Sequence, residues 1–91
     1  MGLLASDQIQ RELSQLTGWK LAGKEIRKTF DLKDFVHAMG FVQSVALLAE
    51  KANHHPDLDI RWNVVTLGLS THSAGGLTEK DFNLAKAIDG L

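Results

Sequence analysis

The strongest constraint on the fold is a long stretch with helical periodicity that ends before Pro56, the only proline of the chain. Asp31 can cap this helix, and Asp34 would then lie in its first turn. One face of the helix carries Phe35, Met39, Val42, Ala46 and Ala49. Proline cannot continue a helix, and it biases the preceding His55 toward an extended conformation. A helix of about twenty residues would run about 30 Å, long enough to cross a small sheet.

A second apolar set on the same stretch widens the apolar stripe of this predicted helix. Its members are Val36, Phe41, Val45 and Leu48. Because a helix that is apolar on more than one side needs more than one packing partner, we expect part of this surface to face another subunit. The sequence therefore predicts a homodimer or a homotetramer.

The segment before the long helix predicts a short helix followed by a β-hairpin. The short helix starts with Ser6 as its cap and ends at Gly18, which permits a turn. Its apolar positions are Ile9, Leu13 and Leu16. Two brief runs follow, 19–22 and 25–30, with Gly23 between them.

The segment after Pro56 predicts strands and a last helix. Between Asn63 and Thr71 the apolar residues alternate with polar or small ones, which is typical of a strand with one packed face. The packed positions are Val65, Leu67 and Leu69. After a loop of small residues, Thr78-Glu79-Lys80-Asp81 has the form of a helix start. The buried stripe of that helix would be Phe82, Ala85 and Ile88.

The order of these elements, α-β-β-α-β-β-α, predicts an α+β fold with a four-stranded antiparallel sheet and helices packed on one face. Ninety-one residues are enough for one core and too few for two, so we expect a single domain over 1–91. A doubly wound parallel sheet is disfavoured, because strands and helices do not alternate regularly and no glycine-rich phosphate loop is present.

Composition excludes several classes of function. Ten Lys and Arg against eleven Asp and Glu give a formal net charge of −1, so the chain lacks the basic excess that direct nucleic-acid binding requires. The longest strictly apolar run, Val45 to Ala49, is far short of the roughly 20 residues of a membrane helix. The absence of cysteine excludes disulfides and thiolate chemistry and fits a cytoplasmic location.

Three of the four histidines lie where elements end, which makes them candidates for chemistry. His54 and His55 follow the long helix, and His72 follows the long strand; His37 lies within the helix and is interpreted as a surface or partly buried side chain. Glu50 lies four residues before His54, so its carboxylate could fix the tautomer of that ring. Successive side chains in an extended segment diverge, so His54 and His55 should do different jobs. The alternative is that both rings only cap helix carbonyls.

Other candidate residues each have a structural reading beside the functional one. His72 precedes the small residues Ser73 and Ala74, which let a ligand approach the backbone, although a histidine at a strand end is more often structural. Asp81 completes a capping box with Thr78, and we favour that role over a site role. Trp19 could line a pocket for a flat ring or could pack in the core, and Trp62 is treated in the same way.

These residues together resemble the signature of the pterin-4a-carbinolamine dehydratase family, E-x3-H-H-P-x5-aromatic-x9-H-x8-D. In this chain the signature is Glu50, His54-His55-Pro56, Trp62, His72 and Asp81, with every spacing intact. The likeness extends through Gly18-Trp19, 33–35, 69–72 and 81–85 and covers most of the chain.

The resemblance implies removal of water from a 4a-hydroxytetrahydropterin to give a quinonoid dihydropterin, which supports pterin recycling. It implies His54 and His72 as the acid–base pair, His55 as the residue that orients the pterin, and Glu50 as a group that tunes His54. It also implies substrate contacts from Pro56, Thr71, Ser73, Ala74, Trp19 and Asp81. The family needs neither a cofactor nor a metal.

Two alternatives remain open at this point. The three histidines, with Glu50 or Asp81, could chemically satisfy a zinc ion. The chain could instead be a protein-interaction module, because some members of the resembled family act as dimerisation cofactors of a homeodomain transcription factor through the surface of the long helix. The apolar segment from Phe41 to Leu48 would suit such a partner.

Overall fold

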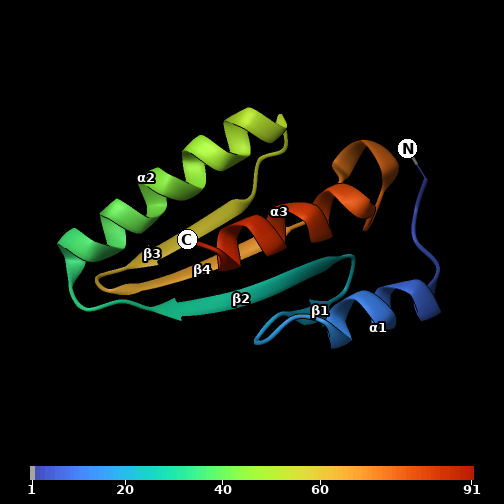
Figure 1. Cartoon of the computed structure of the whole chain (residues 1–91), viewed down its shortest axis with the longest axis horizontal. Coiled ribbons are helices and arrows are strands. Elements are labelled where there is room, and N and C mark those ends of the chain that lie inside the picture. Colours follow the sequence, from blue (N-terminus) through green and yellow to red (C-terminus); the bar gives the residue numbers. More distant parts are fainter. Residues whose placement is uncertain (1) are drawn as a thin grey trace.

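The computed structural model describes residues 2–91, which form three helices around one antiparallel sheet (Figure 1). The elements are α1 (Ser6–Ser14), β1 (Lys20–Ala22), β2 (Glu25–Asp31), α2 (Phe35–Ala52), β3 (Asp57–Arg61), β4 (Val64–Leu69), a 3-10 turn η1 (His72–Ala74) and α3 (Glu79–Asp89). The strands lie in the order β1-β2-β4-β3. The predicted fold class and element order are confirmed. No helix among the described residues is long and apolar enough to cross a membrane.

The core lies between one face of the sheet and the helices α2 and α3 (Figure 1). On β4 the alternating residues Val65, Leu67 and Leu69 are all buried, as predicted. Leu69 pairs with Ile26 of β2, and directly opposed residues of an antiparallel pair share one face. The predicted stripe of α3, Phe82, Ala85 and Ile88, is also buried. The buried faces that alternation predicts for the strands and periodicity predicts for α3 therefore pack in one core.

The face that helix α2 presents to the core overlaps only in part with the predicted one, because Ala49 is buried and Val42 packs against the core as predicted. Its buried residues are Ala38, Val45 and Ala49, whereas Phe35 and Met39 of the predicted face are exposed. The buried face combines members of both predicted apolar sets, since Ala49 belongs to the first and Val45 to the second, with Ala38, which belongs to neither. The apolar stripe is wide enough that periodicity alone does not fix the rotation of the helix.

The start of α2 also differs from prediction. Asp31 is the last residue of β2, and Asp34 is the N-cap, whose Oδ1 accepts a hydrogen bond from the amide of His37 at 2.8 Å. Helix α1 is shifted similarly, because Ala5 is its N-cap and Ser6 is already helical. The Gln8 side chain accepts from the amide of Ala5 at 2.8 Å and replaces the predicted serine cap.

The end of α2 is set by Asn53, three residues before Pro56. Asn53 has left-handed backbone angles, φ 51° and ψ 44°, a conformation that asparagine tolerates better than most residues. The amide of His54 then returns to the carbonyl of Ala49 at 3.0 Å. The helix stops before the proline acts, and this turn determines where the next two side chains point.

Candidate functional site

The centre of the candidate site is a buried contact between His54 and Asp81. Nε2 of His54 lies 2.6 Å from Oδ1 of Asp81. The side chain of Asp81 is 0% exposed and that of His54 is 9% exposed. His54 comes from the loop after α2, and Asp81 comes from the first turn of α3. The contact therefore joins the two helices where the sheet ends.

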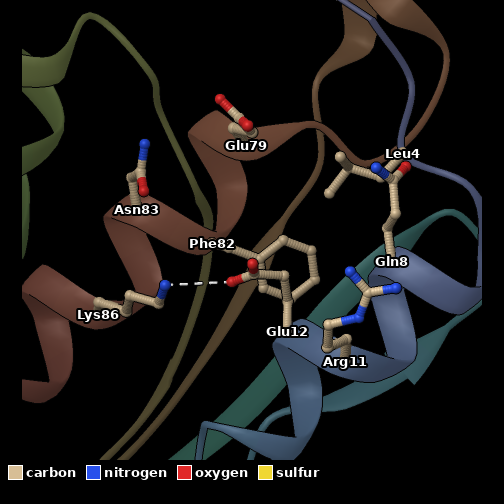
Figure 2. A pocket seen from close by; sticks show the side chains of 8 residues that line it. All are labelled: Leu4, Gln8, Arg11, Glu12, Glu79, Phe82, Asn83 and Lys86. Atoms are coloured by element: carbon tan, nitrogen blue, oxygen red, sulfur yellow. Dashed lines mark hydrogen bonds and ion pairs between the residues drawn. The ribbon is translucent and has the colours of Figure 1, made fainter.

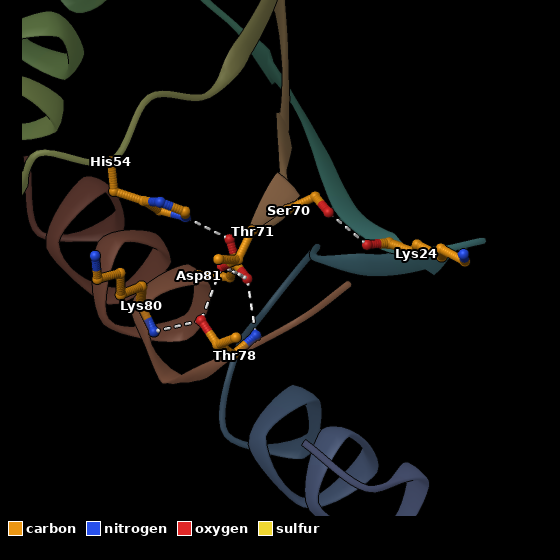
Figure 3. A network of polar contacts seen from close by, with 7 residues as sticks. All are labelled: Lys24, His54, Ser70, Thr71, Thr78, Lys80 and Asp81. Carbon is orange, nitrogen blue, oxygen red and sulfur yellow. Dashed lines mark hydrogen bonds and ion pairs between the residues drawn. The ribbon is translucent and has the colours of Figure 1, made fainter. Parts of the chain in front are cut away.

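Asp81 also accepts hydrogen bonds through its second oxygen (Figure 3). Oδ2 accepts from the Thr71 hydroxyl at 2.8 Å and from the Thr78 amide at 2.9 Å. The two threonine hydroxyl oxygens lie 2.8 Å apart. The predicted capping box of Thr78 and Asp81 is present, and the same carboxylate also holds His54. Asp81 therefore has the structural role and, in addition, the contact with a candidate histidine.

These contacts determine which ring nitrogen of His54 carries the hydrogen. Oδ2 of Asp81 accepts from two donors, so the carboxylate serves as an acceptor in this network. A carboxylate only accepts hydrogen bonds, so Nε2 of His54 is the donor, and in the neutral ring Nδ1 is the acceptor. Within residues 2–91 no solvent-inaccessible side-chain nitrogen or oxygen lacks a partner. The contact with Asp81 engages Nε2, and no hydrogen bond within that range engages Nδ1.

Glu50 contacts His55, and the predicted contact between Glu50 and His54 is absent from the described residues. Oε1 of Glu50 lies 2.8 Å from Nε2 of His55, and both side chains are exposed. The prediction assumed that the helix continues to His54. Because the left-handed Asn53 ends the helix, His54 turns inward to Asp81 and His55 turns outward to Glu50. The predicted divergence of the two rings is confirmed.

His72 lies at the start of η1, directly after Thr71. Its side chain is exposed, as is Ser73, whereas Ala74 is half-buried. The loop is closed by backbone hydrogen bonds between Thr71 and Gly76, with N···O distances of 2.8 and 3.3 Å. Gly75 has φ 80°, a conformation that glycine adopts without strain. The Asp81 network thus ends one residue before His72.

Two hollows adjoin the predicted histidines. His54 lines one of about 430 Å³ between α2 and α3, together with Leu48, Lys51, Ala52, Lys80, Asn83, Leu84 and Ala87. His72 lines another of about 360 Å³ with Ala22, Lys24, Glu25, Ser70 and Gly75. Neither of these two hollows contains both rings. Thr71 links the two histidines, because it directly precedes His72 and its hydroxyl donates to Asp81, the partner of His54.

The two tryptophans do not lie beside the histidines. Trp19 is 5% exposed and belongs to the core, where its Nε1 donates to the Asp89 carboxylate at 3.0 and 3.2 Å. Trp62 is exposed and follows β3 at the end opposite the histidines. Core packing, one of the two readings of Trp19, is the one observed.

A third hollow, of about 250 Å³, lies between α1 and α3 and contains none of the predicted site residues (Figure 2). Its lining mixes charges of both signs, and Lys86 pairs with Glu12 at 3.1 Å.

The residue that sequence reasoning missed is Thr78, which was identified as a helix cap only. The S/T-x-x-D pattern could have revealed it, because such a cap places a hydroxyl beside the carboxylate of Asp81.

Within the described residues, the geometry provides no cluster of ligands for the zinc site considered as an alternative. Among the residues that the structure describes, no group of three or more His, Cys, Asp or Glu is arranged to hold a metal ion. His54 and His55 are directed to two different carboxylates.

His37, interpreted from sequence as a surface side chain, is exposed, and its Nδ1 lies 2.7 Å from Asp34. The His37 amide and ring lower the pKa of Asp34 below its usual value.

Comparison with known proteins identifies the family. The sequence model of the family described as Pterin 4 alpha carbinolamine dehydratase matches residues 2–91. The chain belongs to this family. A pterin-4-alpha-carbinolamine dehydratase of Roseiflexus castenholzii, provisionally named, is 61% identical over 96% of this chain and 94% of its own length. A relative from Acidobacterium capsulatum with the same provisional name is 53% identical over 100% of this chain and 99% of its own length.

A solved structure shares both the fold and much of the sequence. The crystal structure of a transcriptional coactivator/pterin dehydratase from Brucella melitensis has a TM-score of 0.92 and 36% identity, covering 96% of this chain and 95% of that chain. The pterin-4a-carbinolamine dehydratase fold therefore spans nearly all the described residues, and the candidate site lies within it.

Proposed function

We propose that the protein is a dehydratase that removes water from 4a-hydroxytetrahydropterin and releases quinonoid dihydropterin, and that it serves pterin recycling. The observation that carries the proposal is the buried contact between His54 and Asp81 in a chain that keeps the whole family signature. The contact engages Nε2 and leaves Nδ1 of His54 for proton transfer, as acid–base catalysis requires.

The reaction needs two proton transfers and no redox partner. Formation of the C4a=N5 double bond requires loss of the N5 proton and departure of the C4a hydroxyl as water. An imidazole titrates near pH ~6.5 and can accept or donate a proton at neutral pH. Nδ1 of His54 suits the N5 proton, because Nε2 already donates to Asp81. The exposed ring of His72 is left to protonate the leaving hydroxyl.

The remaining predicted residues are assigned to binding. We place the pterin over 71–74, where the backbone of Thr71, Ser73 and Ala74 would contact its edge. His55, held by Glu50, would orient the ring from the other side of the loop, with Pro56 keeping the segment extended. We assign no cofactor and no metal to this reaction.

The test is a stopped-flow absorbance assay of carbinolamine loss with and without the protein. General acids and bases typically contribute ~10²–10⁴-fold, so His54→Ala and His72→Ala should each lose rate on that scale. His37→Ala is the matched control, because this exposed ring also pairs with an aspartate at a helix start. Unchanged turnover in both of the first two variants would contradict the mechanism, and no acceleration by the wild type would contradict the function.

We also propose that the chain self-associates into a homodimer or homotetramer. Val36 and Leu47 of α2 are 76% and 65% exposed, and every residue of the edge strand β3 is exposed. Sedimentation or scattering mass tests this, and a monomer mass at micromolar concentration would contradict it. The alternative function, a protein-interaction module, draws on the coactivator description of the Brucella melitensis structure and needs the same α2 surface to be free in solution.

A further inference from the structure

Thr78 is a fully buried residue that contacts the Asp81 network three times. It is the N-cap of α3, and its side chain is 0% exposed. Its amide donates to Oδ2 of Asp81 at 2.9 Å, and its hydroxyl oxygen lies 2.8 Å from that of Thr71. The same hydroxyl oxygen accepts from the Lys80 amide at 3.3 Å. The amide contact with Asp81 and the contact with Lys80 are those of a helix cap, so the contact with the Thr71 hydroxyl is the one that a cap does not need.

The hydrogen positions in this network have one consistent arrangement. Each hydroxyl has a single hydrogen. That of Thr71 is donated to Oδ2 of Asp81, so the hydrogen between the two threonines comes from Thr78. The Lys80 amide can only donate, which matches the acceptor side of the Thr78 hydroxyl. Donors therefore run in one direction, from the first turn of α3 through both threonines to Asp81.

We propose that Thr78 is a positioning residue that holds His54 in the tautomer with hydrogen on Nε2. The amide and hydroxyl of Thr78 orient the Asp81 carboxylate, and Oδ1 of that carboxylate accepts from Nε2 of His54. Hydrogen bonds in such a chain strengthen one another, so loss of one hydroxyl is felt at the far end. The consequence for catalysis rests on the proposed function, but the tautomer does not.

The primary experiment measures the tautomer directly. Two-bond ¹H–¹⁵N correlation spectra of ¹⁵N-histidine-labelled protein distinguish a protonated Nε2 from a protonated Nδ1. Wild type and Thr78→Ser, which keeps the hydroxyl, should show His54 with hydrogen on Nε2. Thr78→Val keeps the shape of the side chain but removes the hydroxyl, and should show a mixture of the two tautomers. If valine prevents folding, Thr78→Ala removes the same hydroxyl and gives the same comparison.

Loss of a helix cap alone must be separated from this effect. Asp34→Ala removes the cap of α2 and should leave the His54 spectrum unchanged. In the dehydratase assay Thr78→Val should lower kcat about tenfold with little change in KM, as expected when a partner behind a reacting group is lost. Thr78→Ser should restore kcat.

The outcomes separate the two proposals. A folded Thr78→Val protein with the wild-type His54 spectrum overturns the positioning role. A mixed tautomer in Thr78→Val, together with a wild type that does not accelerate carbinolamine loss, supports the positioning role and overturns the dehydratase function. A mixed tautomer in Asp34→Ala overturns the positioning role, because any cap would then have the same effect.

Discussion

The molecule contains two aspartates at helix starts, and each contacts a histidine in different surroundings. At α2, Oδ1 of Asp34 lies 2.7 Å from Nδ1 of His37, and the two side chains are 43% and 56% exposed. At α3, Oδ1 of Asp81 lies 2.6 Å from Nε2 of His54, and the side chains are 0% and 9% exposed. The distances are nearly equal, so distance alone does not distinguish a surface cap from a candidate site.

The difference lies in what surrounds each carboxylate. Asp34 accepts from its own helix and from a ring three residues away. Asp81 accepts from residues of three separate segments, namely His54, Thr71 and Thr78. Water competes for the first pair and is excluded from the second, so the second is the one whose geometry is fixed. Burial with full hydrogen bonding is what distinguishes the candidate site from a surface helix cap.

The largest expected difference is in stability. Asp81→Ala leaves three buried donors without an acceptor and should lower the free energy of unfolding by about 3–5 kcal/mol. Asp34→Ala should cost much less, because water replaces the lost acceptor. Urea denaturation of both variants measures this, and equal losses would show that burial does not separate the two pairs.

The next difference is in activity. Asp81→Asn keeps the size of the side chain but presents an amide to Nε2 of His54, so the ring loses the partner that fixes its tautomer. We expect carbinolamine turnover to fall about 100-fold. The control, Asp34→Asn, should turn over at the wild-type rate. A fully active Asp81→Asn protein would remove His54 as the base.

A smaller difference should appear in the response to salt. A double-mutant cycle of His54→Ala and Asp81→Ala should give a coupling energy of about 1.5–3 kcal/mol that persists in roughly 1 M salt. The cycle of His37→Ala and Asp34→Ala should give a weak coupling that salt removes, since both groups are exposed. Similar salt sensitivity in the two cycles would contradict the burial argument.

The smallest effect concerns pH. The His37 amide, and then its ring, hold the pKa of Asp34 below the usual 3.8. A lowered folded-state pKa stabilises the fold above the unfolded value, and this stabilisation is lost as pH falls through the folded value. The stability of the wild type relative to Asp34→Asn should therefore be constant near neutral pH and shrink below about pH 4. A stability difference between wild type and Asp34→Asn that grows as the pH falls would contradict this prediction.

Most of the fold could be predicted from patterns among residues that are close together in the sequence. The alternation of Val65, Leu67 and Leu69 determines both β4 and its buried face. The buried face of α2 could be predicted only in part, because the apolar stripe is wide and packing against the sheet selects Ala38, which belongs to neither predicted apolar set. The cap of α2 was placed at Asp31 because two aspartates lie close together, and pairing of β2 with β4 includes Asp31 in the strand.

For the candidate site the structure tests the predicted contacts, whereas the choice of residues stays a prediction. The sequence spacing predicts Glu50 as the partner of His54, and the structure places Asp81 there instead. The predicted contact with Glu50 needed a continuous helix, and one residue with positive φ, Asn53, interrupts it. The contact between His54 and Asp81 joins positions 27 residues apart, so only the tertiary structure brings them together.

The left-handed turn at Asn53 has a consequence for how this protein could change. It directs the ring of His54 to the buried carboxylate of Asp81 and the ring of His55 to the exposed carboxylate of Glu50. We expect a single-residue insertion between Ala52 and His54 to move both rings away from these carboxylates, although both histidines stay in the chain. The arrangement of the two rings therefore depends on loop length as much as on the identity of the histidines.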